Sequence, residues 1–418
     1  MNRLGLIKTN YENTYVFPPP PTYVTLQFGG TGNDQLFDVK VSSTGDYVVL
    51  GRSSSSSLDG NANPNADSWF VAVLDPLLPP SGFIKDIRWE DAATLSMGQC
   101  GRGYTFEIDS DVVYYAMGTY STGMTTDWVV KRVALSDLTT AVSSATWQTQ
   151  YGSNRIQIRS GKIYVACLWD SSHADVRRYD GTTMAFETSM NNYGGGQCIR
   201  DMVYAGTSWF LVHGGFVGTY PSITSIYGDL SGNGGAGEVL GASVGLRLCR
   251  YSSILWGLTL VTDGSFLYIS GDNYYPAGGQ DWTVFLKYTI ANKPVYSAHQ
   301  QTLNGLYTMG GCSVIGGNVT LFGYSRDAGK VGANDMIRLT RQCSDMSVVA
   351  TNDWARYNDG SQIGEALKNY ISTATPQLYD TGKYVGCGYT DGDLVGFTNA
   401  GSNDCIIWKM DLTGTVLP

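Results

Sequence analysis

The stretch Tyr47-Val48-Val49-Leu50-Gly51 decides the fold, because close copies of it recur along the chain. Each copy is a short run of aromatic and β-branched residues that stops near a glycine, which is typical of a buried strand followed by a turn. The six further copies, which complete a series with spacings of 46 to 67 residues, are Tyr114–Gly118, Tyr164–Cys167, Phe210–Gly214, Leu267–Gly271, Val319–Gly323 and Tyr384–Gly388. Spacings of this length indicate a repeat protein.

A second signal follows most copies after a loop: an aspartate that opens an alternating strand, as in Asp67–Val71. It returns in five further units, at Asp127, Asp175, Asp281, Asp335 and Asp404. The fourth unit has Tyr220–Ile223 in its place, and aromatic outer strands close several units, as at Trp147–Gly152 and Trp354–Asn358. Units of roughly 40–60 residues with several short strands are typical of propeller blades, whereas a sandwich does not repeat seven times. The sequence therefore predicts an all-β, seven-bladed β-propeller.

The two ends of the repeat series complement each other. The seventh unit stops soon after its third strand, whereas Tyr23–Gly30 has the pattern of an outer strand but precedes the first unit. We therefore expect the N-terminal strand to close the last blade, which removes a sheet edge that would otherwise pair with other chains. This divides the chain into an N-terminal arm, residues 1–22, and a propeller, residues 23–418.

Several stretches of the first unit resemble a known family. They are Gln27–Asp34, Asp38-Val39, Gly45–Gly51 and Asp67–Asp75. In these stretches the chain resembles the secreted bacterial seven-bladed propeller repeats of the SBBP type. The resemblance extends loosely over the chain after residue 22, and the third and fourth units depart from it. It implies a scaffold for surface display or binding and no particular chemistry, because this fold hosts many functions.

Composition narrows the class of protein. The 418 residues include 43% hydrophobic and 12% aromatic side chains, enough to bury a core and to exclude disorder. There is no run of ~20 apolar residues, so we expect no transmembrane helix. The formal charge of −9 without any Lys/Arg stripe disfavours a nucleic-acid partner. Residues 1–22 lack the apolar core of a secretory leader, so we expect a protein that is made in the cytoplasm and released by another route, such as lysis.

Histidine and nucleophile chemistry is poorly supported. The three histidines, His173, His213 and His299, fall in different units, and His213 occupies a strand position held by apolar or small residues elsewhere. A histidine metal site needs at least two of them within reach of each other. The sequence has no Gly-x-Ser-x-Gly elbow and no repeated sialidase turn. A glycosidase pair among the loop carboxylates stays open as an alternative.

The acidic residues invite two interpretations. The repeated aspartate is interpreted as structural, because a strand-entrance aspartate can bond nearby backbone amides and because one active site does not explain repetition. Two glycine-rich loops are weak calcium candidates: one carries Asp229, Ser231 and Asn233, and the other carries Asp391 and Asp393. The first loop copies the oxygen spacing of a calcium loop but has Leu240 at the twelfth place, so ordinary turns are the favoured interpretation of both loops.

Eight cysteines stand far apart, with no Cys-x-x-Cys pair that would suggest zinc or redox chemistry. Cys387 and Cys405 flank a 17-residue hairpin loop, and antiparallel pairing could set them opposite each other at a separation that disulfides accept. Two buried thiols are the favoured interpretation, and a disulfide is the alternative.

Two segments carry candidate binding residues. The loop at Asn273, Tyr274 and Tyr275 combines tyrosine with small polar residues, a composition of adaptable recognition surfaces. The arm has four apolar or aromatic residues, Tyr11, Tyr15, Val16 and Phe17, followed by the four prolines of 18–21. Because such a proline run favours a stiff, extended spacer, we predict that the arm docks on a partner chain. A disordered tail is the alternative.

These observations predict a non-catalytic propeller without a cofactor. The expected function is display on a virion, as a phage tail, fibre or capsid decoration protein that attaches to other virion proteins through the arm and adheres to host-surface glycans. Two alternatives stay open: a glycan-active hydrolase with its site at the propeller mouth, and a bacterial surface lectin.

Overall fold

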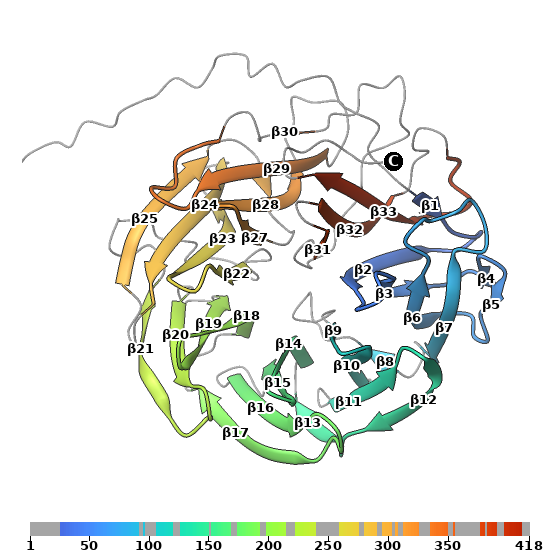
Figure 1. Ribbon diagram of the computed structural model, residues 1–418, viewed down its shortest axis with the longest axis horizontal. Coiled ribbons are helices and arrows are strands. Elements are labelled where there is room, and N and C mark those ends of the chain that lie inside the picture. Colours follow the sequence, from blue (N-terminus) through green and yellow to red (C-terminus); the bar gives the residue numbers. More distant parts are fainter. Residues whose placement is uncertain are drawn as a thin grey trace, which may run out of the picture.

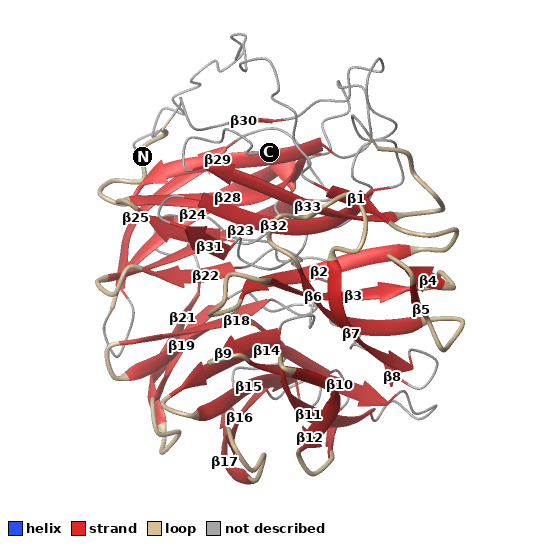
Figure 2. Cartoon of the chain, turned by 45° about the vertical axis from the view of Figure 1, so that its right-hand side comes forward, coloured by secondary structure: helices blue, strands red, loops and turns tan. Residues whose placement is uncertain are grey.

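A computed structural model describes most of the chain. The described residues are 26–91, 95–96, 106–119, 126–149, 152–168, 174–192, 198–214, 222–239, 259–275, 280–290, 295–302, 306–307, 312–325, 335–349, 354–355, 377–380, 383–390 and 397–411. Every helix or strand among them is a β-strand (Figure 2). The strands form seven sheets of four to six strands and one two-stranded ribbon. We number the seven sheets 1 to 7 in chain order.

The first four sheets follow one another along the chain. Sheet 1 contains β2 (Asp34–Val41), β3 (Tyr47–Ser53), β6 (Ser68–Leu74) and β7 (Ile84–Asp91), and the ribbon β4 (Ser57–Leu58) with β5 (Asn61–Ala62) lies between β3 and β6 in the chain. Sheet 2 contains β8 (Leu95–Ser96), β9 (Phe106–Asp109), β10 (Val112–Thr119), β11 (Thr126–Ala134), β12 (Asp137–Ser143) and β13 (Trp147–Thr149). Sheet 3 contains β14 (Gly152–Arg159), β15 (Lys162–Leu168), β16 (Ala174–Asp180) and β17 (Phe186–Asn192). Sheet 4 contains β18 (Cys198–Ala205), β19 (Ser208–Gly214), β20 (Ser222–Tyr227) and β21 (Asn233–Val239).

Three further sheets complete the series, and the last one includes a strand from the other end of the chain. Sheet 5 contains β22 (Thr259–Thr262), β23 (Phe266–Tyr275), β24 (Gln280–Thr289) and β25 (Val295–Thr302). Sheet 6 contains β26 (Leu306–Tyr307), β27 (Cys312–Ile315), β28 (Asn318–Ser325), β29 (Asp335–Gln342) and β30 (Trp354–Ala355). Sheet 7 contains β31 (Gln377–Asp380), β32 (Lys383–Thr390), β33 (Asp404–Asp411) and β1 (Leu26–Phe28). All the pairings are antiparallel.

The sheets are arranged around a common centre in chain order, which is the arrangement of a β-propeller (Figure 1). The innermost strands are β2, β9, β14, β18, β22, β27 and β31, and the first six of these contact one another in sequence. All seven predicted repeat stretches lie in the strand that pairs with the innermost one, which we call the second strand of its sheet, from β3 to β32. The all-β propeller that the repeat predicts is therefore confirmed.

The core lies between neighbouring sheets, because the second strand of each sheet is buried on both faces. Sheets 1 and 2 show the pattern: Val48 and Leu50 of β3 pack in one cluster with Val113 and Tyr115 of β10. Five comparable clusters join sheets 7 and 1, 2 and 3, 3 and 4, 4 and 5, and 5 and 6. The apolar alternation of the repeat thus packs these neighbouring sheets against one another.

A recurring tyrosine ties adjacent sheets through a hydrogen bond. The hydroxyl of Tyr114, in β10 of sheet 2, donates to the carbonyl oxygen of Gly181 in sheet 3 at 3.0 Å. The hydroxyl of Tyr164, in β15 of sheet 3, donates to the carbonyl oxygen of Gly228 in sheet 4 at 3.4 Å. Both glycines lie in the turn between the third and fourth strands of their sheet. The tyrosine that begins several repeat stretches therefore has an inter-sheet role.

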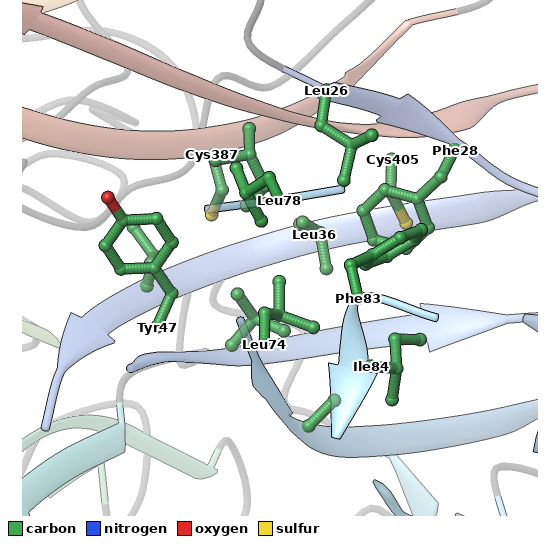
Figure 3. Close-up of a cluster of buried hydrophobic side chains, with 14 of the residues drawn as sticks. Leu26, Phe28, Leu36, Tyr47, Leu74, Leu78, Phe83, Ile84, Cys387 and Cys405 are labelled. Carbon is green, nitrogen blue, oxygen red and sulfur yellow. The ribbon is translucent and has the colours of Figure 1, made fainter. Parts of the chain in front are cut away.

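The N-terminal strand β1 is the outermost strand of sheet 7, where it pairs with β33. Leu26 and Phe28 of β1 are buried beside Cys405 and against Leu36 of sheet 1 (Figure 3). The Phe28 ring meets the Phe83 ring edge to face, with centroids 4.8 Å apart. The predicted pairing of the first strand with the last is present, and it brings sheet 7 against sheet 1.

Two buried carboxylates reinforce this junction. Asp34 of β2 accepts hydrogen bonds from the Ser53 hydroxyl at 2.5 Å, the Ser55 hydroxyl at 2.6 Å and the Gly30 amide at 2.7 Å. Asp404 of β33 accepts hydrogen bonds from Gln27 Nε2 and from the Ala400 amide, both at 3.1 Å. Because both carboxylates are almost fully buried, these bonds hold the chain on either side of β1 in a fixed path.

Candidate functional site

The innermost strands of four consecutive sheets carry ionisable side chains that point to a common site. The set, which we name the inner charge cluster, consists of Asp38 and Lys40 on β2, Glu107 on β9, Arg155 on β14 and Asp201 on β18. Asp38, Lys40, Arg155 and Asp201 are buried, whereas the Glu107 side chain is 21% exposed. Figure 1 shows the four strands next to the centre of the propeller. Buried charges are rare unless they are paired, so this cluster is the candidate functional site.

A β-bulge precedes three members of the cluster. The pairing of β2 with β3 skips a residue between Leu36 and Asp38, and β14 and β18 skip one before Arg155 and before Asp201. A bulge adds one residue to a strand and changes the direction of the side chain that follows. On β2, Val39 then joins the apolar cluster with sheet 7, so the alternation of the strand puts Asp38 and Lys40 on its opposite face.

Two ion pairs connect the inner strands. Lys40 Nζ lies 3.5 Å from Glu107 Oε2, joining sheets 1 and 2, and Arg155 Nε lies 3.0 Å from Asp201 Oδ1, joining sheets 3 and 4. Asp201 also accepts hydrogen bonds from two backbone amides, those of Met202 at 2.8 Å and of Leu260 on β22 at 2.9 Å. Burial raises the pKa of Asp201, and Arg155 and these amides oppose the shift.

Asp38 is the least satisfied member of the cluster. Its Oδ1 accepts a hydrogen bond from the Val39 amide at 2.8 Å, and its Oδ2 is buried with no hydrogen-bond partner among the described residues. Burial raises the pKa of Asp38 to about 7, and the charge of Glu107 adds to the increase, while Lys40 and Arg155 act in the opposite direction. The carboxyl group therefore changes its charge near neutral pH.

The chemistry of the cluster follows from this burial. Asp38 is fully buried, so it can exchange a proton but does not present a surface to a substrate. The two ion pairs hold their strands together and leave Asp201 engaged with three donors. The arrangement can take up a proton and fix the inner strands.

The sequence signal for this cluster was missed, although one exists. Asp38, Arg155 and Asp201 each stand nine residues before the aromatic residue that begins the repeat stretch of their unit. Lys40 and Glu107 each stand seven residues before it. The two distances differ by two residues, which is the side-chain period of a strand, so these charged residues are expected on one face of the strand that precedes the repeat stretch. This signal lies in strands, whereas the predicted binding residues lie in loops and in the arm.

The first calcium candidate, the segment that starts at Asp229, forms a turn. The Asp229 carboxylate accepts a hydrogen bond from the Ser231 amide at 2.9 Å, which lowers the pKa of Asp229 together with a bond from the Ser231 hydroxyl. Asn233 begins β21 and pairs with Ile226. The second candidate, Asp391 and Asp393, lies outside the described residues. No group of three or more His, Cys, Asp or Glu side chains in the described part of the chain is arranged to hold a metal ion.

The segment that was predicted to be a ligand-binding loop forms the end of a strand. Asn273, Tyr274 and Tyr275 are the last residues of β23, where they pair with Trp282, Asp281 and Gln280 of β24. The aromatic content of this segment favours a strand, and the hairpin continues past the point where a loop was expected. The assignment of these residues to a loop was therefore wrong, and the turn itself, 276–279, lies outside the described residues.

His213 is buried on β19, where its Nε2 lies 2.8 Å from the Thr224 hydroxyl on β20. This contact agrees with the structural role expected from its strand position. His173 and the four arm residues Tyr11, Tyr15, Val16 and Phe17 lie outside the described residues, so docking by the arm stays a prediction. His299 belongs to β25.

Cys387 and Cys405 are buried thiols and form no disulfide. In the pairing of β32 with β33, Cys387 stands opposite Ile407 and Cys405 stands opposite Tyr389. The two cysteines are therefore offset along the strands and are not cross-strand partners. Burial raises the pKa of Cys405 well above its ordinary value, so this thiol stays protonated and unreactive.

The repeated aspartates have more than one structural role. Asp404 bonds the nearby Ala400 amide, as predicted. Asp67 and Asp175 pair instead with arginines: Arg52 Nε donates to Asp67 at 2.9 Å, and Arg177 Nε donates to Asp175 at 2.8 Å. At these two positions an arginine two residues away or on the neighbouring strand supplies a charged donor, and a bond to local backbone amides stays a prediction there.

The comparisons with known proteins concern the fold. No family model and no curated protein matches the chain. Similar solved structures include the Dos1 propeller, with 10% identity over 91% of this chain and 93% of that chain and a TM-score of 0.47. The WD40 domain of SCAP from fission yeast has 8% identity over 96% of this chain and 99% of that chain, with a TM-score of 0.43. Hydrazine synthase of Kuenenia stuttgartiensis has 14% identity over 82% of this chain and 80% of that chain, with a TM-score of 0.44.

These identities and TM-scores are low, so the fold assignment rests on the sheets and their arrangement around a centre. The sheets and their arrangement define the class of the protein as an all-β propeller. In the described part of the chain there is also no helix long and apolar enough to span a membrane.

Proposed function

We propose that this chain is a non-catalytic, seven-bladed propeller that is displayed on a virion and serves structural attachment and adhesion to host-surface glycans. In this proposal each of the seven sheets is one blade, and β1 closes the last blade. The pairing of β1 with β33 supports the closure. The hydrogen bond from the Ser313 hydroxyl in sheet 6 to the Tyr384 hydroxyl in sheet 7, at 3.2 Å, adds a further link around the ring.

The position of β1 carries the attachment proposal. This strand is the outermost strand of sheet 7, and its side chains are buried between sheets 7 and 1. The N-terminal end of β1, at Leu26, therefore lies at the perimeter of the propeller. Attachment from this point would leave the centre of the ring free.

The burial of the inner charge cluster supports a non-catalytic role. A glycosidase needs two carboxyl groups that face the sugar from opposite sides. Asp38 is fully buried, and Asp201 is engaged by Arg155 and two amides. These carboxyl groups therefore act within the scaffold.

Deletion of residues 1–22 tests the attachment. The deletion keeps β1 and the whole junction with β33, so we expect the thermal unfolding midpoint of the truncated protein to match that of the full chain. We expect the truncated protein to be lost from purified particles when particles are assembled with it. A second variant keeps the arm but replaces Tyr11, Tyr15 and Phe17 by serine, and it should be lost from the particles in the same way. Full incorporation of both variants contradicts the proposal.

A glycan array tests the adhesion. The full chain and the truncated protein should bind the same glycans, because the deletion leaves the loops of the ring unchanged. The alternative of a propeller-mouth hydrolase makes a different prediction, in which array glycans are cleaved. Cleavage of an array glycan by the purified chain overturns the non-catalytic proposal, and the absence of any glycan binding overturns adhesion.

A further inference from the structure

The inner charge cluster contains one more negative than positive group. Its three carboxyl groups, Asp38, Glu107 and Asp201, face two cations, Lys40 and Arg155. When all five side chains are charged, the cluster carries a net charge of −1 in a buried environment. An excess charge of this kind is costly because water cannot solvate it. One bound proton removes the excess.

The hydrogen bonds identify the group that takes this proton. Glu107 lies against Lys40, and Asp201 accepts from Arg155 and from the amides of Met202 and Leu260. Protonation of either one weakens bonds that are already made. Asp38 has only the short-range bond from its neighbour Val39, and its Oδ2 has no partner in the described part of the chain. Asp38 is therefore the carboxyl group whose protonation weakens the fewest hydrogen bonds and ion pairs.

We propose that the inner charge cluster is a proton-binding site, in which Asp38 takes up one proton and makes the hold between the inner strands of sheets 1 to 4 dependent on pH. The charged groups that face Asp38 are Lys40 from its own strand, Glu107 from β9 and Arg155 from β14. Sheet 7 packs on β2 with three titratable side chains, Cys387, Cys405 and Tyr389. Asp404 faces the Asp34 end of the strand. This site is separate from the proposed attachment through the arm.

The direction of the effect follows from linkage. The pKa of Asp38 is about 7 in the folded protein and near its ordinary value of 3.8 in the unfolded chain, because burial is lost on unfolding. Between these values the folded protein holds a proton that the unfolded chain has released. The contribution of Asp38 to folding stability therefore falls as the pH rises from about 4 to about 7, and it levels off above that range. The difference of about three pKa units corresponds to roughly a thousandfold in the folding equilibrium.

The first test compares the pH dependence of urea unfolding in the full chain and in Asp38→Asn. The amide of asparagine is neutral at every pH and has nearly the same shape. We expect the variant to exceed the wild type in stability at about pH 8 by up to about a thousandfold in the folding equilibrium, and to match it at about pH 4. A variant that keeps the wild-type pH dependence overturns the proposal.

The second test observes the proton directly and does not depend on stability. The infrared carbonyl band of a protonated carboxylic acid should be present in the wild type at about pH 6, absent at about pH 9, and absent at both in Asp38→Asn. Two neighbours supply controls of opposite sign. Glu107→Gln removes a negative charge and should move the titration midpoint to lower pH, whereas Lys40→Met should move it to higher pH. Midpoints that do not move, or a band that persists in Asp38→Asn, assign the proton to another group.

Discussion

The side chain of Gln27 donates from Nε2 to Asp404 Oδ2 at 3.1 Å, although 377 residues separate the two in the chain. The bond joins β1 to β33 at the place where sheet 7 meets sheet 1. Asp404 also accepts from the Ala400 amide, so one buried carboxylate holds both the first strand and the turn that leads into the last one. This junction is the part of the fold on which the proposed closure of the ring depends.

Gly29 lies within the junction and has no room for a side chain. A methyl group at this position would overlap the carboxylates of both Asp404 and Asp34. We expect Gly29→Ala to lower the free energy of unfolding by about 1–3 kcal/mol, as overpacking does in other interiors. Urea unfolding measures the change. Gly232→Ala is the matched control, because its new methyl group would lie at ordinary contact distance from the Tyr227 ring, and a control that is equally destabilised contradicts the explanation.

The ion pair between Arg155 and Asp201 predicts a non-additive pair of substitutions. Arg155→Met leaves the buried Asp201 carboxylate with only its two amide donors, and we expect a loss of about 3–5 kcal/mol in the free energy of unfolding. Adding Asp201→Leu removes the unpaired charge, so the double variant should recover part of this loss. Chemical denaturation of the single and double variants gives the coupling energy. Additive losses would show that the two side chains do not interact.

The inter-sheet tyrosines predict a graded effect. Tyr114→Phe removes a hydrogen bond of 3.0 Å to the Gly181 carbonyl, and Tyr164→Phe removes a longer one of 3.4 Å to the Gly228 carbonyl. The ring and its packing stay in both variants. We expect a loss of about 1 kcal/mol for Tyr114→Phe and a smaller loss for Tyr164→Phe in urea unfolding. A larger effect of Tyr164→Phe contradicts the assignment of these bonds.

Cysteine labelling tests the packing between β32 and β33. Burial raises the pKa of Cys405 well above its ordinary value, so in the native protein at about pH 8 this thiol should resist alkylation. After unfolding in urea it should react, and intact mass measured without reductant should show no bond between Cys387 and Cys405. A native mass lower by two hydrogens, with linked peptides after digestion, contradicts the structure.

How much could be read from the sequence depends on the range of the interaction. The stretch Tyr47–Gly51 predicts β3 correctly, because local alternation of apolar residues is enough to identify a buried strand. The strand character of Asn273–Tyr275 was not predicted, since tyrosine and asparagine are also common in loops and only the pairing with β24 decides the matter. Strand identity is thus local information, whereas the length of a hairpin is not.

The candidate site could not be predicted from the sequence alone, because its residues come together only in the folded chain. Asp38 and Arg155 stand in different units, and their charges come together because the inner strands of successive sheets share one centre. The regular distance to the next aromatic residue indicates a shared face of the strand, but it does not say that the faces converge. The bulges before Asp38 and Arg155 also leave no mark in the composition of β2 and β14. The pairing registers supply both facts.

Two deletions test whether β1 closes the propeller while the residues before it are dispensable for folding. Thermal unfolding is measured for the full chain, for the chain without residues 1–22 and for the chain without residues 1–28. We expect the first deletion to leave the midpoint unchanged. The second removes Leu26, Gln27 and Phe28 and exposes the edge of β33, so it should lower the midpoint and promote self-association, which sedimentation would detect. Equal midpoints for all three proteins contradict the closure of the ring by β1.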